Sequence, residues 1–173
     1  MNAPPQFKAA TLRVQAALAQ AGLDAEIVRV DEKARTAEGA ATAVGATVGQ
    51  IVKSLVFLSG GVPVLALVSG SNRLDTDRLA ARTGGQITRA DADAVRDATG
   101  YAIGGIPPLG HATTLPVYCD EDLLLHDVVW AAAGTPDTVF AVSPDRLVEA
   151  TGAQVCALAT QTTPPRVPGD GGG

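Results

Sequence analysis

The sequence is poor in aromatic residues and in the side chains that most often bind metals. Aromatic residues make up 3% of its 173 residues, and it contains two cysteines and two histidines. Cys119 and Cys156 are too far apart for a CxxC pair, and two histidines complete no recognisable zinc spacing. We therefore expect an aliphatic core, two reduced structural thiols, no metal site and no cofactor.

The charge balance is acidic, which limits the classes of partner. Thirteen Lys and Arg stand against 18 Asp and Glu, for a net charge of -5. This excludes the broad basic surface that neutralises phosphates in proteins that wrap DNA. The sequence also lacks a run of about 18 apolar residues, and its start lacks a basic segment followed by an apolar one. These features predict a cytoplasmic protein that binds neither DNA nor a membrane.

Hydrophobic residues make up 46% of the sequence, which is enough for one folded core. We expect a single domain over 1–158, followed by a disordered tail rich in Pro and Gly over 159–173. Periodicity and capping residues predict helices over 7–21, 36–45, 72–83, 90–99 and 143–152. They predict strands over 26–30, 51–58, 62–68, 101–104, 115–118, 128–132 and 138–142. This irregular order favours a mixed α+β fold.

A predicted hairpin, with its turn at 59–61, carries an unusual lysine on its first strand. Alternation places Lys53, one of only three lysines, on the same strand face as Ile51, Leu55 and Phe57. An ammonium group is costly to bury without a partner. Lys53 therefore either extends to solvent near the sheet edge or points into a pocket, where it would hold a carbonyl or phosphate oxygen.

The segment 104–111 is the second candidate, because it is too rich in Gly and Pro for regular structure. Glycines let backbone N–H groups approach a ligand closely, and prolines stiffen a turn, as an oxyanion site requires. The alternative is a plain turn. His111 at its end either caps the turn or belongs to the site, whereas His126 is interpreted as a structural or surface residue.

The common hydrolase and nucleotide motifs are absent from the sequence. Ser69, Gly70 and Ser71 do not form a GxSxG elbow, and neither a P-loop nor a dinucleotide fingerprint occurs. Arginines and aspartates are equally frequent over 73–97. That balance predicts a salt-bridged helical surface first and a polyanion site second.

Three segments together resemble the YbaK/ProX family of aminoacyl-tRNA deacylases, which are relatives of the editing domain of bacterial prolyl-tRNA synthetases. The resemblance extends over about residues 9–158, in order and without a large gap. The three segments are 36–57, which contains Lys53, 100–111, in which Gly104 to Pro108 matches the family's GxxxP signature, and 120–137.

The resemblance implies a compact α+β fold with a mixed, barrel-like sheet and surrounding helices. It also implies hydrolysis of the ester between a wrong amino acid and the tRNA 3′ end. It places the catalytic groups at Lys53, Gly104 and Gly105. It places the substrate-binding residues at Ser54, Ile106, Pro107, Pro108, Gly110, His111 and Asp137. No metal is needed, because a positioned water or the substrate's own thiol or hydroxyl can attack.

One position departs from the family pattern. Some relatives have a histidine in the turn 134–138, where this sequence has Asp137. Asp137 either takes over part of the histidine's polar role or leaves that role absent. The departure supports, as an alternative to catalysis, a module that binds tRNA or a synthetase without turnover. A weaker alternative is hydrolysis of another small ester or amide.

The first hypothesis is a trans-editing deacylase that acts on tRNA-Pro carrying a small amino acid such as Cys or Ala. Its expected partners are the acceptor 3′ end of mischarged tRNA and a prolyl-tRNA synthetase. Arg73, Arg78 and Arg82, together with Lys53, would supply a local positive rim despite the overall negative charge. We therefore expect weak, salt-sensitive affinity for tRNA.

Overall fold

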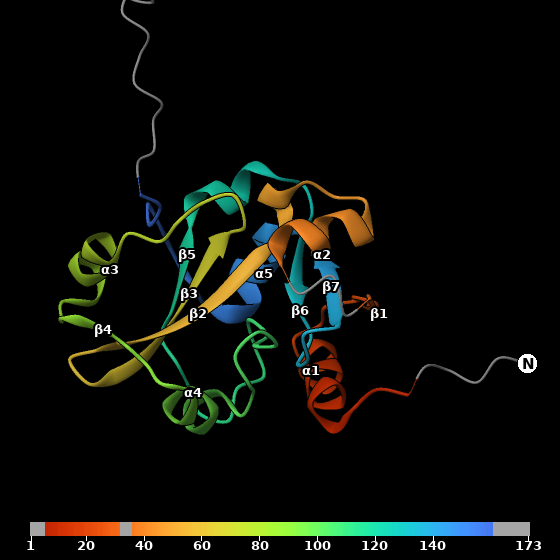
Figure 1. The fold of residues 1–173 in the computed structure, drawn as a ribbon, viewed down its shortest axis with the longest axis horizontal. Helices are drawn as coiled ribbons and strands as arrows, with labels where there is room; N and C mark the ends of the chain where they lie inside the picture. The colour runs from red at the N-terminus through yellow and green to blue at the C-terminus, as the bar shows by residue number, and fades with distance from the viewer. Residues whose placement is uncertain (1–5, 32–35, 161–173) are drawn as a thin grey trace, which may run out of the picture.

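The computed structural model describes residues 6–31 and 36–160 of the chain. It has five α-helices and two β-sheets among these residues, arranged as a mixed α+β fold (Figure 1). The expected α+β class is confirmed. The elements are α1 (Ala9–Gln20), β1 (Ile27–Arg29), α2 (Ala37–Val44), the 3-10 helix η2 (Val48–Gln50), β2 (Val52–Ser59), β3 (Val62–Ser69), α3 (Thr76–Thr83), β4 (Ile87–Arg89), α4 (Ala92–Thr99), β5 (Val117–Asp120), the 3-10 helix η3 (Glu121–Leu125), β6 (Val129–Ala132), β7 (Thr138–Val142), α5 (Pro144–Thr151) and β8 (Gln154–Cys156).

The larger sheet has the strand order β4-β2-β3-β5-β8, and the smaller one has the order β1-β7-β6. Pairing is antiparallel from β4 to β3 and parallel from β3 to β8. The two sheets meet where Ile51, just before β2, forms a bridge with Trp130 of β6. The strands form two sheets in the described residues, and the barrel-like arrangement of the expected fold stays a prediction.

The predicted hairpin is present as β2 and β3, in register from Val52 opposite Ser69 to Ser59 opposite Val62. Gly60 has φ +54° and Gly61 has φ +85°, the left-handed values that a tight two-residue hairpin turn requires. β3 is buried on both faces from Val64 onward, because it contributes to two clusters of apolar side chains. Leu65 and Leu67 pack on one side, and Val64, Ala66 and Val68 pack on the other.

The predicted helix caps also form. Thr36 Oγ1 accepts a hydrogen bond from Gly39 N at the start of α2, and Gly45 closes that helix in the left-handed conformation. Asp75 and Asp91 accept backbone hydrogen bonds at the starts of α3 and α4. These two helices therefore begin at Thr76 and Ala92, later than the predicted starts, because the aspartates are caps rather than members of the first turn.

The predicted strand over 101–104 is wrong, because glycines turn the chain there. Gly100 and Gly104 both have positive φ, and Gly105 N donates to Ala102 O in a turn, 3.1 Å away. Two short edge strands, β4 and β8, are absent from the sequence prediction. Each has three residues, which is too short for an alternating pattern to distinguish it from a loop.

The described chain continues two residues beyond the predicted domain end at Leu158. Ala159 forms a bridge with Leu74, and Thr160 N donates to Arg73 O. The rest of the predicted tail, 161–173, lies outside the described residues. Within the described ranges, no helix is both long enough and apolar enough to cross a membrane.

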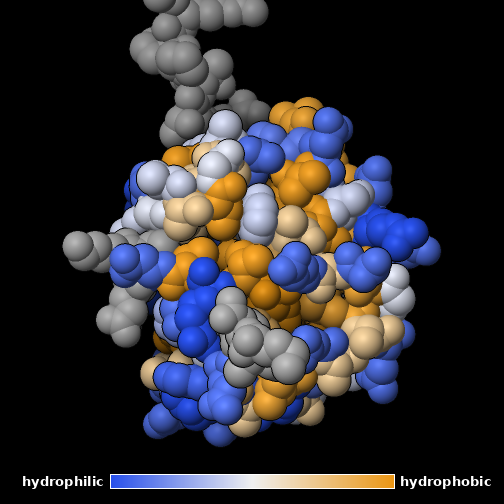
Figure 2. All heavy atoms as spheres, turned by 90° about the vertical axis from the view of Figure 1, so that its right-hand side faces the viewer, coloured by the Kyte–Doolittle hydropathy of each residue, from blue (hydrophilic) through white to orange (hydrophobic). Residues whose placement is uncertain are grey.

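The surface is not uniformly polar. On the face shown in Figure 2, hydrophobic residues gather in a central area that hydrophilic residues surround. Exposed apolar surface is normal for a folded domain, so this area by itself does not indicate a binding site.

Candidate functional site

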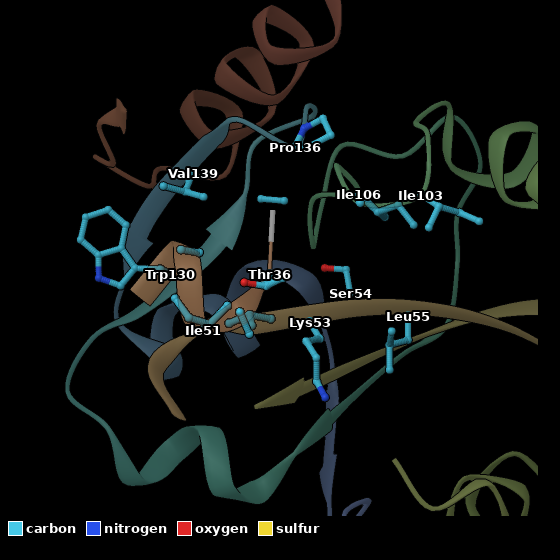
Figure 3. Close-up of a pocket in the computed structure, with 15 residues that line it drawn as sticks. Thr36, Ile51, Lys53, Ser54, Leu55, Ile103, Ile106, Trp130, Pro136 and Val139 are labelled. Carbon is cyan, nitrogen blue, oxygen red and sulfur yellow. The ribbon is translucent and has the colours of Figure 1, made fainter. Parts of the chain in front are cut away.

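A cavity of about 300 Å³ lies at the junction of the two sheets. Its walls come from α2, the start of β2, the turn around Gly104, and the strands β6 and β7 (Figure 3). Most of the lining is apolar, and apart from the indole of Trp130 the side chains in it that carry polar atoms are those of Thr36, Lys53 and Ser54. The lining residues are Thr36, Ala37, Ala40, Ile51, Val52, Lys53, Ser54, Leu55, Ile103, Gly104, Ile106, Trp130, Ala132, Pro136 and Val139.

Lys53 and Ser54 are adjacent in β2, so their side chains leave the strand on opposite sides. Figure 3 shows Ser54 on the side that faces Ile106 and Lys53 on the other side. Lys53 shares its side with Leu55 and Phe57, which pack against the smaller apolar cluster, as the alternation predicts. Both residues are among those that line the cavity, and the side chain of Lys53 leaves β2 on the side away from Ile106 and Pro136 (Figure 3).

The ammonium group of Lys53 donates a hydrogen bond to the backbone carbonyl of Asn72 in the loop after β3. Burial lowers the pKa of Lys53, and the nearby carboxylate of Glu38 partly opposes this by favouring the charged form. An ammonium group has three N–H donors. One is used by Asn72, which leaves donors for a ligand.

Asn72 is itself held in place by two carboxylates. Its Nδ2 donates to Asp120 Oδ2 over 2.9 Å and to Asp122 Oδ2 over 2.7 Å. Asp120 is only 1% exposed, and its Oδ1 accepts a hydrogen bond from Leu158 N over 3.1 Å. Lys53 is therefore connected through Asn72 to β5 and to the segment after β8.

Ser54 lies between Val52 and Val56 on the face of β2 that packs against the main apolar cluster. Its Oγ is buried and has no hydrogen-bond partner among the described residues. A buried hydroxyl without a partner costs about 1–3 kcal/mol. The wall of the cavity therefore contains a buried polar group whose hydrogen-bonding capacity is unused.

The turn at 104–106 forms the wall of the cavity that faces Ser54, and its two glycines contribute to it in different ways. Gly104 lines the cavity and has φ +96°, a conformation that a residue with a side chain rarely adopts. Gly105 packs against the turn after β6: its O accepts from Gly134 N over 3.0 Å, and a Cβ on it would lie 2.8 Å from Thr135 Cα. The N–H of Gly105 is occupied by Ala102 O.

The remaining predicted residues of the loop, apart from Ile106, do not line the cavity. Ile106 lines the cavity, whereas Pro107 and Pro108 are buried in the loop. His111 Nε2 lies 2.7 Å from Pro107 O, so this nitrogen carries the proton and donates it to the carbonyl. Gly110 O accepts from the Tyr101 hydroxyl over 2.9 Å. Burial lowers the pKa of His111, which favours its neutral form.

Asp137 also does not line the cavity. Its Oδ1 accepts a hydrogen bond from Thr135 Oγ1 over 2.7 Å, and its Oδ2 lies 4.0 Å from Arg29 Nε. The neighbouring Pro136 lines the cavity instead. The substrate-binding role of Asp137 stays a prediction.

Both cysteines are buried and free, on the neighbouring strands β5 and β8. Burial is the main reason that the pKa of Cys119 is raised to about 12, and it also raises the pKa of Cys156. Neither thiol lines the cavity. In the described ranges, no group of three or more His, Cys, Asp or Glu residues is arranged to hold a metal ion.

Several wall residues were not predicted as site residues from the sequence. Thr36, Ala37 and Trp130 lie in the segments that carry the family resemblance, which was the available signal. Asn72, which holds the lysine, had no such signal. Its role arises from a contact between residues 19 positions apart in the sequence.

Comparison with known proteins agrees with this geometry. The model of the aminoacyl-tRNA editing domain family matches residues 31–150. A protein of Enterococcus faecalis, assigned as the Cys-tRNA(Pro)/Cys-tRNA(Cys) deacylase EbsC, is 27% identical over 128 residues, which cover 73% of this chain and 78% of that protein. A proline–tRNA ligase of Maridesulfovibrio salexigens is 30% identical over 131 residues, or 73% of this chain and 22% of the ligase.

A crystal structure assigned as a trans-editing enzyme for prolyl tRNA synthetase superposes with a TM-score of 0.87 and 48% identity. The match covers 90% of this chain and 99% of that one. The expected resemblance to the deacylases is thereby confirmed, since relatives assigned as hydrolytic editing enzymes match most of the chain. The family match, the sequence relatives and the superposition together show that this chain belongs to the aminoacyl-tRNA editing domain family.

Proposed function

We propose that the protein hydrolyses the ester bond of tRNA-Pro that carries a wrong, small amino acid, and so acts in trans to a prolyl-tRNA synthetase in the cytoplasm. Cysteine and alanine are the first candidates for that amino acid. The observation that carries the proposal is the apolar cavity at the sheet junction, which has a lysine on one wall and a glycine turn on the other. The amino-acid pocket of a synthetase discriminates between small side chains by only about 1–3 kcal/mol per methylene group. Wrong small amino acids therefore require a second, hydrolytic site.

The chemistry fits the groups at the cavity. Ester hydrolysis passes through an oxyanion, which backbone N–H groups stabilise when they are fixed in advance. The N–H groups of Gly104 and Ile106 have no hydrogen-bond partner among the described residues, whereas that of Gly105 is occupied. We assign the carbonyl of the substrate to this turn. The attacking group is a water or a hydroxyl of the substrate, which is held close by the same cavity.

Lys53 would bind an oxygen of the terminal nucleotide or of the ester with the N–H donors that Asn72 leaves unused. We propose that Ser54 contacts the amino acid. Pro107, Pro108, Gly110 and His111 would act indirectly by fixing the turn, since they do not line the cavity. Asp137 would contribute through its contacts with Thr135 and Arg29 rather than through the substrate.

The test is hydrolysis of tRNA-Pro charged with Cys, Ala or Ser by the wild-type protein and by Lys53→Ala. We expect the variant to lose at least tenfold in kcat/KM. Lys8→Ala, which removes an exposed lysine just before α1, is the matched control and should retain full activity.

Full activity of Lys53→Ala would contradict the proposed mechanism. Binding of the charged tRNA without turnover by the wild-type protein would instead favour the non-catalytic module. Hydrolysis of a free aminoacyl ester but not of charged tRNA would indicate a different small substrate.

A further inference from the structure

Helix α1 contacts both turns that contribute to the cavity wall, although none of its own residues lines the cavity. Gly134, in the turn after β6, lies so close to α1 that a Cβ on it would be 2.8 Å from Ala10 O. Thr11 Oγ1 lies 3.2 Å from Thr138 Oγ1, at the start of β7. These contacts hold the turn that places Pro136 in the cavity wall.

The loop that begins at Gly100 and ends at Gly110 carries the glycine turn, and α1 contacts it at both ends. Arg13 Nη2 donates a hydrogen bond to Gly100 O over 2.9 Å. At the other end, a Cβ on Gly110 would lie 2.9 Å from Ala17 Cβ. The Tyr101 hydroxyl donates to Gly110 O over 2.9 Å and so joins the two ends of the loop.

Arg13 makes a second contact with this loop, through the ring of Tyr101. Its guanidinium carbon lies 5.1 Å from the centroid of the ring, which is a cation–π distance. Tyr101 is only 2% exposed, whereas Arg13 is exposed. A planar guanidinium can stack on a ring, and a lysine ammonium lacks that planar surface. Arg13 therefore links α1 to the loop through a side chain that can be replaced without opening the core.

We infer that Arg13 is a positioning residue for deacylation, because it fixes the loop that presents the N–H groups of Gly104 and Ile106 to the substrate. Arg13 would act through the loop, without contacting the substrate. Only a few residues separate its contacts from the turn, and Gly105 N donates to Ala102 O within that short segment. Oxyanion stabilisation requires donors that are fixed in advance. This inference rests on the proposed deacylase function and adds to it a residue outside the cavity.

The test compares the wild-type protein with Arg13→Ala, Arg13→Lys and Gln15→Ala, all at exposed positions of α1. Arg13→Lys keeps the charge but loses the planar group, and Gln15→Ala is the matched control on the same helix. We would measure kcat and KM for tRNA-Pro charged with Cys or Ala, at low and at high salt, and Tm by thermal unfolding. Hydrogen exchange of the amides over 101–110 would report on the loop independently of activity.

We expect Arg13→Ala to lower kcat about tenfold with little change in KM, because displaced donors weaken binding of the transition state more than binding of the substrate. A purely structural role would lower Tm without this separation of kcat from KM. Arg13→Lys should recover only part of kcat, and Gln15→Ala should match the wild type. The amides over 101–110 should exchange faster in Arg13→Ala than in Gln15→Ala.

Three results would overturn the inference and leave the deacylase function intact. Unchanged kcat in Arg13→Ala is one, and unchanged exchange of the amides over 101–110 is another. The third is a rise in KM that is confined to low salt and absent in Arg13→Lys, which would make Arg13 a contact for a tRNA phosphate. If the wild-type protein hydrolyses no charged tRNA, the proposed function itself fails, and hydrogen exchange still shows whether Arg13 fixes the loop.

Discussion

The ammonium group of Lys53 in β2 is bound to the backbone carbonyl of Asn72, in the loop that follows β3. The side-chain amide of Asn72 is bound in turn by Asp120 and Asp122. The position of the lysine charge therefore depends on a polar network outside its own strand. We propose that Asn72 is a positioning residue, which would act on the substrate through Lys53.

Substitution of Asn72 should reduce both stability and activity. Asn72→Ala removes the amide that pairs with the buried Asp120, which should lower the free energy of unfolding by about 1–3 kcal/mol. Asn72→Asp should cost more, because it places a third carboxylate beside Asp120 and Asp122. Urea unfolding measures the stability. If Asn72 positions Lys53, then Asn72→Ala should raise KM more than it lowers kcat, and a change in stability alone would contradict that role.

The imidazole of His111 makes stability depend on pH. Because burial lowers its pKa in the folded protein, the unfolded chain binds the proton more readily. The free energy of unfolding should therefore decrease as pH falls below about 6.5, the pKa expected in the unfolded chain. His111→Gln does not titrate and should remove this part of the pH dependence. Urea unfolding at about pH 5 and about pH 7.5 would test this, and an unchanged pH profile in the variant would contradict it.

Gly105→Ala should destabilise the wall of the cavity. The new Cβ would lie 2.8 Å from Thr135 Cα, so the turn or its neighbour must shift. Such overpacking usually costs about 1–3 kcal/mol. Thermal unfolding would show it as a lower Tm. Ala102→Ser, at an exposed position of the same turn, is the control and should leave Tm nearly unchanged.

The two thiols should react slowly with an aromatic disulfide reagent in the native protein. Both are buried, and the pKa of Cys119 is raised to about 12, so little thiolate is present near neutral pH. Denaturation should release two fast-reacting thiols. Modification of both cysteines in the native state without loss of Tm would show that they are accessible after all.

Affinity for tRNA should be weak and salt-sensitive, with Arg73 as one contributor. This exposed residue directly follows Asn72, whose backbone carbonyl accepts a hydrogen bond from Lys53. If it contacts a phosphate, then Arg73→Ala should weaken binding and reduce the slope of log affinity against log salt by about one. Arg96→Ala, at an exposed position on α4, is the matched control. Equal effects of the two substitutions would argue against a local rim.

The elements that local chemistry determines could be predicted from the sequence. Gly60 and Gly61 favour a tight hairpin turn between two β-rich segments, and Thr36 with Gly45 marks both ends of α2. β4 and β8 could not be predicted, because a three-residue edge strand exists only when a partner strand lies beside it. The strand over 101–104 was predicted from its apolar residues, but the positive φ values of the flanking glycines produce a turn.

In the candidate site, too, residues marked by their own segment could be predicted, whereas contacts between distant segments could not. Lys53 was recognisable because alternation within β2 places a charge among apolar neighbours. The partner that holds it, Asn72, depends on the return of β3 and on carboxylates from 120–122. The missing partner of Ser54 also depends on how distant segments pack around it. A sequence pattern can mark a residue, but it does not show which side-chain atoms remain unpaired.

The hydrogen bond from Leu158 N to Asp120 Oδ1 makes the end of the described chain a support for the lysine. Asp120 accepts a hydrogen bond from Asn72, and the bridge between Ala159 and Leu74 is a second contact that holds the loop after β3. A protein shortened to residue 157 would lose both ties while keeping every residue that lines the cavity. Editing activity should thus be sensitive to where a C-terminal tag or fusion begins, and a junction after Thr160 is the safer choice for anyone who engineers this domain.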